Sequence, residues 1–137
     1  MNPSIEPFIT THDASLLHSL AYQAKGGRDS IVDQVVDLLD DVQIVDVLPG
    51  PRVGIGGDVR YIEGTSGAMR AVTLTLPAQA DPAQHRISVL SPVGRALFGR
   101  APSDLVRVEL PGARVAQLVI IEVTPHAEEE LSAEMED

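Results

Sequence analysis

The stretch from Ile87 to Glu122 constrains the fold more than any other part of the chain. It begins with the alternation of a strand, and Ser91 and Pro92 follow it. Serine is preferred at the N-cap of a helix, and proline suits the first helical position because its φ angle is already helical. Gly99 is the kind of residue that ends a helix. The pattern therefore predicts a strand, a sharp turn and a short helix.

Two further strands are expected after this helix. Apolar residues fill most of Leu105 to Leu110, and Pro111-Gly112 is a typical turn. The following run from Leu118 to Val123 is apolar enough to lie inside a sheet.

Composition limits the classes of protein that remain. The chain has 137 residues, 44% of them hydrophobic and only 3% aromatic, which allows one modest domain and an appendage. It has no cysteine, which excludes disulfides and thiolate metal sites and is typical of a cytoplasmic protein. We see no signal-peptide pattern and no apolar run near the length of a membrane span, so we expect a cytoplasmic location and no membrane contact.

The net charge of −10 is unevenly distributed. Residues 1–50 carry −6, residues 51–125 carry +2 with arginine as the only base, and residues 126–137 carry −6 with no base. An acidic chain is a poor match for nucleic acid, because phosphate neutralisation drives that binding. Arginine, by contrast, is enriched at protein interfaces. We expect a monomer that binds a protein, with an acidic tail at 126–137 that is too charged to pack.

Residues 1–48 are predicted to form a short antiparallel helical hairpin. Thr10 and Asp13 resemble a capping box at the start of the first helix. Lys25 to Asp29 must interrupt it, and Ser30 marks the start of a second helix with a broad apolar face up to Val42. Four aspartates lie on its other face, which is either a solvated surface or an acidic surface for a basic partner: Asp33, Asp37, Asp40 and Asp41.

Residues 49–125 are predicted to form an antiparallel β domain around the short helix, so the fold class is α+β. A strand-like pattern starts at Arg52 and is interrupted at Gly56-Gly57 by a bulge or a tight turn. Gly64 to Gly67 is a hairpin turn, Met69 to Leu76 a strand, and Pro77 to Gln84 a loop.

No self-contained active site is visible in the sequence. The four histidines are scattered, at His12, His18, His85 and His126. The glycines follow no phosphate-loop or dinucleotide spacing, and no serine lies in a nucleophile elbow. We therefore expect no catalytic residue, no metal and no cofactor, and hence a protein that is not an enzyme.

Residues 52–124 resemble the C-terminal domain of the Gre transcription elongation factors. The resemblance is carried by Ser91-Pro92-Val93-Gly94, by Ala96-Leu97-Phe98-Gly99 and by the Ser103-Asp104 turn, where the family usually has Gly-Asp. It implies an FKBP-like fold, which is an antiparallel sheet curled around one short helix. Within the family, the chain looks similar to the Gre-like regulators of nucleoside diphosphate kinase (Rnk), which have a short hairpin before the same domain.

This resemblance implies a partner, RNA polymerase, bound near the rim of its secondary channel. The residues that would contact it are Ser91, Pro92, Val93, Gly94 and Arg95. Plain helix capping also explains Ser91 and Pro92, and a solvated surface also explains Arg95 and Arg100.

The hairpin argues against transcript cleavage, which in this family uses acidic residues at the tip of a long coiled coil. Each helix here has about 12–14 residues, which gives a reach of roughly 20 Å. At the tip, Asp29 is the only acid and lies beside Lys25 and Arg28. We expect a regulator that competes with Gre factors without cleaving transcripts.

Two other functions are open at this point. One is an FKBP-type prolyl isomerase, which would need an aromatic pocket that two Phe and two Tyr can hardly form. The other is a generic protein-interaction module with a different partner.

Overall fold

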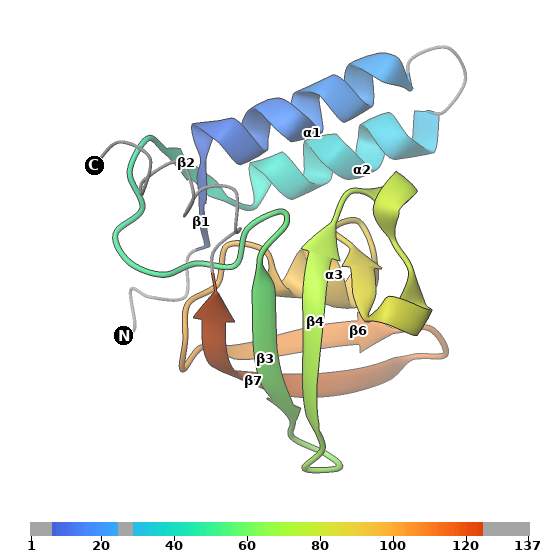
Figure 1. Ribbon diagram of the computed structural model, residues 1–137. Helices are drawn as coiled ribbons and strands as arrows, with labels where there is room; N and C mark the ends of the chain where they lie inside the picture. The colour runs from blue at the N-terminus through green and yellow to red at the C-terminus, as the bar shows by residue number, and fades with distance from the viewer. Residues whose placement is uncertain (1–6, 25–28, 125–137) are drawn as a thin grey trace.

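The computed structural model describes residues 7–24 and 29–124, and it is a helical hairpin set against a curled sheet (Figure 1). The hairpin consists of α1 (Thr11–Gln23) and α2 (Asp29–Asp40), with 13 and 12 residues. The predicted lengths are therefore confirmed.

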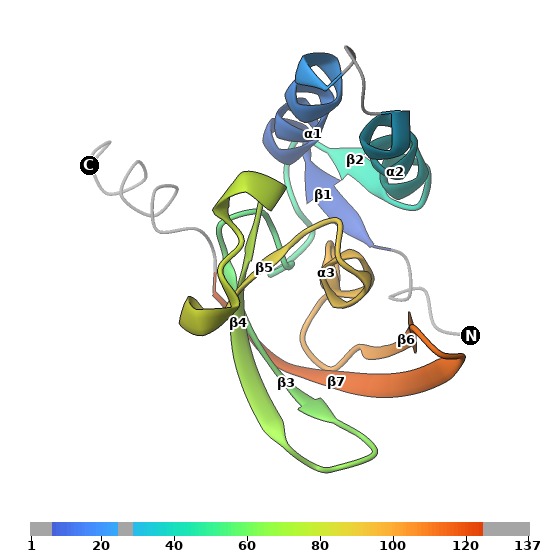
Figure 2. The ribbon, with the colours of Figure 1, turned by 90° about the vertical axis from the view of Figure 1, so that its right-hand side faces the viewer.

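The larger of two sheets has five strands, in the order β5-β4-β3-β7-β6. Its strands are β3 (Asp58–Glu63), β4 (Met69–Thr75), β5 (Arg86–Ser88), β6 (Leu105–Leu110) and β7 (Arg114–Thr124). All pairs are antiparallel except β4 with β5, and the register of β3 on β7 shifts between Arg60 and Tyr61. The short helix α3 (Pro92–Leu97) lies inside the curl, between the sheet and the hairpin (Figure 2).

Most predicted elements appear, but two strands are shorter than the sequence suggested. The strand expected from Arg52 begins only at Asp58, because Gly56 adopts φ +88° in a tight turn closed by the Gly57 N–H on the Gly54 carbonyl. The loop from Pro77 to Gln84 contains two 3₁₀ turns, η2 (Pro77–Gln79) and η3 (Pro82–Gln84).

The strand expected between Ile87 and the N-cap at Ser91 ends early, at Ser88. The side chain of Ser88 accepts the N–H of Leu90 at 3.0 Å, and its carbonyl accepts the N–H of Ser91 at 3.0 Å. The chain therefore turns before the helix rather than at its first residue.

A small second sheet was not predicted. β1 (Phe8–Thr10) pairs in parallel with β2 (Gln43–Val45), and the N–H of Gln43 donates to the carbonyl of Pro7 at 2.8 Å. Three residues are too few to show a periodicity, so no sequence pattern indicates this pairing. The pair brings the segment before α1 beside the segment after α2.

The core is aliphatic, as the composition requires. Leu97 and Phe98 at the end of α3 are fully buried, and the strands pack their inward residues against them. Phe98 is 1% exposed and Tyr61 is 4% exposed, so both of these aromatic rings serve the core.

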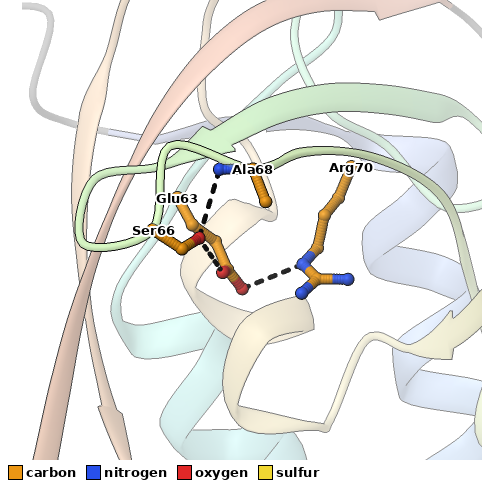
Figure 3. A network of polar contacts seen from close by, with 4 residues as sticks. All are labelled: Glu63, Ser66, Ala68 and Arg70. Carbon is orange, nitrogen blue, oxygen red and sulfur yellow. Dashed lines mark hydrogen bonds and ion pairs between the residues drawn. The ribbon is translucent and has the colours of Figure 1, made fainter.

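The turn between β3 and β4 carries a polar network on the surface (Figure 3). Ser66 Oγ donates to Glu63 at 3.0 Å and accepts the Ala68 N–H at 3.1 Å, while Arg70 Nε pairs with the other oxygen of Glu63 at 3.0 Å. The hydrogen bond from Arg70, followed by that from Ser66, lowers the pKa of the Glu63 carboxyl. The network fixes the predicted hairpin turn, which Gly67 completes with φ +75°.

Gly99 joins three segments of the chain. Its carbonyl accepts the N–H of Phe8 at 3.0 Å, and its own N–H donates to Val53 at 2.8 Å. It has φ +81°, and a Cβ there would lie 2.8 Å from the Cβ of Pro7. The predicted end of the short helix is thus also where β1 meets the domain.

Asp13 provides a second link between the hairpin and the domain. Thr10 caps α1 by accepting the Asp13 N–H at 3.1 Å, which confirms the predicted N-cap. The Asp13 carboxylate, 5% exposed, reaches across the interface and accepts the N–H of Ile55 at 3.1 Å. Gly54 leaves room for this contact, because a Cβ there would lie 2.9 Å from the carboxylate oxygen.

Replacing Asp13 with alanine is expected to destabilise the protein. The substitution leaves the buried N–H of Ile55 without this acceptor, which costs about 1–3 kcal/mol of unfolding free energy. Urea denaturation measures this loss of unfolding free energy. The matched control is Asp37→Ala on the exposed face of α2, expected to change stability by less than about 0.5 kcal/mol. Equal effects of the two substitutions would contradict the assigned link.

Candidate protein-interaction site

The turn that leads into α3 is held by Ser91. Its backbone is extended, with φ −70° and ψ 160°, and its Oγ accepts the N–H of Gly94 at 3.1 Å while donating to the carbonyl of Ser88 at 2.7 Å. Pro92 occupies the first helical position. The predicted capping is therefore confirmed, and it orients this short helix on the sheet.

The five residues predicted to contact a partner differ in exposure. Pro92 is exposed, whereas Ser91, Val93 and Arg95 are half-buried, and Gly94 is buried. A Cβ on Gly94 would overlap the carbonyl oxygen of Ser88, so only glycine allows β5 and α3 to approach so closely. Pro92 and Arg95 are the two of the five that line a groove.

This groove has a volume of about 660 Å³ and lies between α2, α3 and β6. Its lining is part apolar, from both the hairpin and the domain, and part charged. The charged side chains are Asp41, Arg95, Arg100, Arg107 and Glu109. The groove therefore depends on how the hairpin is seated, and the sequence did not reveal it.

Two of the three groove arginines, Arg95 and Arg107, differ from Arg100 in their ionic contacts. Neither Arg95 nor Arg107 forms an ion pair within the described part of the chain. The pKa of Arg100 is lowered, first because burial disfavours its charge; Asp104 and Asp41 oppose this shift, and Arg52 adds to it. Asp41, which the sequence placed on either a solvated surface or an acidic surface for a basic partner, thus lies near a base of the same chain.

Arg52 lines a second, smaller pocket of about 200 Å³ at the junction of the hairpin and the domain. Its guanidinium lies over the ring of Phe8, 4.9 Å from the centroid. Its Nε and Nη1 atoms are buried and have no hydrogen-bond partner among the described residues. Nothing in the local sequence singled out Arg52, because its environment comes from β1.

The turn after α3 keeps its geometry although serine replaces the usual glycine. Ser103 adopts φ +78°, and its N–H donates to the carbonyl of Ile120 at 2.7 Å. Asp104 is buried and accepts the N–H of Ala101 at 3.0 Å. The departure from the pattern therefore leaves the turn intact.

Of the predicted hairpin tip, the structure describes only Asp29, which lies away from this groove. Asp29 begins α2, whereas Asp41, which lines the groove, follows the opposite end of that helix. Lys25 and Arg28, and the acidic tail at 126–137, lie outside the described residues. Within the described ranges, no three His, Asp or Glu side chains are grouped to hold a metal.

The chain also lacks membrane-spanning helices in its described part. None of the helices between residues 7 and 124 combines the length and hydropathy needed to cross a bilayer.

Comparison with protein families identifies the domain around the groove. Residues 48–125 match the family described as "Transcription elongation factor, GreA/GreB, C-term". The chain belongs to the GreA/GreB family. The match begins after β2 and includes α3 and all five strands of the large sheet.

Individual relatives carry the same name. A "Transcription elongation factor GreA" of Desulfovibrio desulfuricans is 41% identical over 87 residues, which are 64% of this chain and 49% of that protein. One of Nitratidesulfovibrio vulgaris is 32% identical over 114 residues, which are 79% of this chain and 71% of that protein. The chain thus spans only about half of the first relative.

A solved structure shares the fold over most of the chain. It is titled "Prokaryotic transcription elongation factor GreA/GreB from Nitrosomonas europaea" and is similar with a TM-score of 0.65 and 29% identity. The likeness covers 88% of this chain and 98% of that one, so it includes hairpin and domain.

Replacing Gly94 with alanine is expected to destabilise the turn that holds α3. The added methyl group overlaps the Ser88 carbonyl, and such overpacking costs about 1–3 kcal/mol of unfolding free energy. Gly50→Ala is the matched control, because a Cβ there meets nothing within 4 Å. Thermal unfolding of both variants decides the matter: a Gly94 variant as stable as the Gly50 variant would disprove this packing.

Proposed function

We propose that this protein is a regulator that binds RNA polymerase at the rim of the secondary channel. The domain at 49–125 makes the contact, through the turn from Ser91 to Arg95. The observation that carries the proposal is that this turn, with its exposed Pro92, opens onto a groove in the domain that the GreA/GreB family shares.

The chemistry of the groove favours a protein partner. Its apolar lining includes Leu38, Leu90 and Phe98, while Arg95 and Arg107 supply charge. Apolar contact together with arginine is typical of protein interfaces. The net charge of −10 disfavours direct binding to nucleic acid.

The same protein is proposed not to stimulate transcript cleavage. Helices of 13 and 12 residues extend about 20 Å at about 1.5 Å per residue. Asp29, the first residue of α2, is the only acid at the predicted tip, and Lys25 and Arg28 precede it, which makes a poor site for a divalent cation. We infer a non-enzymatic regulator, acting as a cytoplasmic monomer without a cofactor, that competes with Gre factors for the channel rim.

Within the family, we assign the chain to the Gre-like regulators of nucleoside diphosphate kinase (Rnk) with an FKBP-like domain. The short hairpin, the sheet curled around α3 and the Glu109-Leu110-Pro111-Gly112 run support this assignment. A prolyl isomerase is disfavoured because Phe98 and Tyr61 are buried in the core. The remaining alternative is an interaction module with a different partner.

The Pro92→Glu variant is expected to lose polymerase in a pull-down from lysate. Glutamate at the first helical position suits the helix dipole, so α3 should persist while a charge enters the contact surface. Pro82→Glu is the matched control, because Pro82 is also exposed and also begins a short helical turn capped by the side chain before it. We expect the Pro92→Glu variant to recover about tenfold less polymerase than the Pro82→Glu variant.

Two results would count against this function. Absence of polymerase subunits with the wild-type chain would favour the alternative module. Equal recovery of polymerase with both variants would show that the Ser91–Arg95 turn does not contact polymerase.

A backtracked polymerase complex tests the lack of cleavage activity. We expect the transcript to remain uncut at saturating wild-type protein, with a Gre cleavage factor as the positive control. Cleavage that disappears in an Asp29→Asn variant would contradict the account.

A further inference from the structure

Four arginines from separate segments lie along the junction of the hairpin and the domain; we call them the arginine surface: Arg52, Arg95, Arg100 and Arg107. Arg52 lines the small pocket and the other three line the groove. Arg52 and Arg100 are close enough for their charges to repel. The pocket and the groove therefore lie close to each other, with a positive charge in each.

Arg52 has two buried donors that find no acceptor in the described part of the chain. Its Nε and Nη1 atoms have no partner within the described residues, and leaving a buried donor unsatisfied costs about 1–3 kcal/mol. The ring of Phe8 stabilises the positive charge but accepts no ordinary hydrogen bond. An acceptor from outside the described residues would remove this cost.

The chain leaves the described structure beside this pocket. β7 ends at Thr124, and Val123 lines the same pocket as Arg52. Residues 125–137 follow, and extended they reach about 43 Å at about 3.3 Å per residue. A compact domain of 100 residues has a radius of gyration of only about 13 Å, so the whole arginine surface is within reach.

The charge of that segment is complementary to the surface. Residues 126–137 contain six acids and no base. Asp13, Asp41 and Glu109 also line the two hollows. Asp13 is bonded to the Ile55 N–H, Asp41 lies near Arg100, and Glu109 forms no ion pair within the described residues. Arg52, Arg95 and Arg107 are left without an ionic partner within residues 7–24 and 29–124.

We propose that the acidic segment 126–137 binds along the arginine surface of its own chain, with a carboxylate on Arg52 and further carboxylates over the groove. The segment and the polymerase then compete for one surface. This consequence rests on the proposed function, whereas the contact within the chain does not. If the segment covers the surface nine-tenths of the time, it weakens the apparent affinity for polymerase about tenfold.

The contact within the chain can be tested without polymerase. The full-length variant replaces all six acids by their amides, at Glu128, Glu129, Glu130, Glu134, Glu136 and Asp137. These changes lie outside the described fold. The side-chain Nε–H resonances of the arginines are compared with those of the wild type, at low salt and at about 0.5 M salt, where charge interactions are screened.

We expect the Nε–H resonances of Arg52, Arg95 and Arg107 to shift in the variant, and in the wild type at high salt. Arg70 is the internal control for the variant at low salt, because its ion pair with Glu63 is independent of the segment. A synthetic peptide of residues 126–137 added to the variant should restore the wild-type positions, and its amide version should not. Identical spectra of wild type and variant would overturn the proposal.

Polymerase binding then separates this inference from the proposed function. The amide variant is expected to bind polymerase about tenfold more tightly than the wild type. If the resonances shift but neither protein binds polymerase, the proposed function fails and the contact stands. If polymerase binds both equally and the resonances do not shift, the function stands and the proposal about the segment is wrong.

Discussion

The close approach of the backbone at Gly99 is the constraint on which the rest of the structure depends. Gly99 directly follows the core residue Phe98. Its backbone forms hydrogen bonds with Phe8, which precedes the hairpin, and with Val53, which precedes the sheet. Its φ is positive, and a Cβ added there would lie only 2.8 Å from Pro7, so no side chain fits. The buried bond from Asp13 to the Ile55 N–H adds a second attachment, so the hairpin sits in one orientation on the domain.

That orientation creates the surface on which the functional account rests. The groove exists because the end of α2 lies opposite α3 and β6, and its charged residues come from all three places. Arg52 lies over Phe8 only because β1 is seated on the domain. Asp41 lies near Arg100 because the end of α2 is held there. The family shares the domain, but the charges around the turn from Ser91 to Arg95 also depend on where the hairpin lies.

Sequence reasoning succeeded where the signal was local. Ser91 with Pro92, and Thr10 before α1, are caps whose partners lie three residues away, and both occur as predicted. It failed where partners were distant: Asp13 bonds a backbone N–H 42 residues away, and β1 with β2 form a pair too short to show periodicity. The candidate turn could therefore be named from the sequence. The groove beside it and the arginine surface could not, because packing assembles them from separate segments.

A displacement experiment tests the central claim most directly, namely that this chain occupies the Gre site on polymerase. Labelled protein bound to core RNA polymerase is titrated with an unlabelled Gre cleavage factor, and the bound fraction is followed by fluorescence anisotropy. The account predicts complete displacement, with reciprocal displacement of a labelled Gre factor by this chain. Simultaneous binding of both proteins to one polymerase would contradict it.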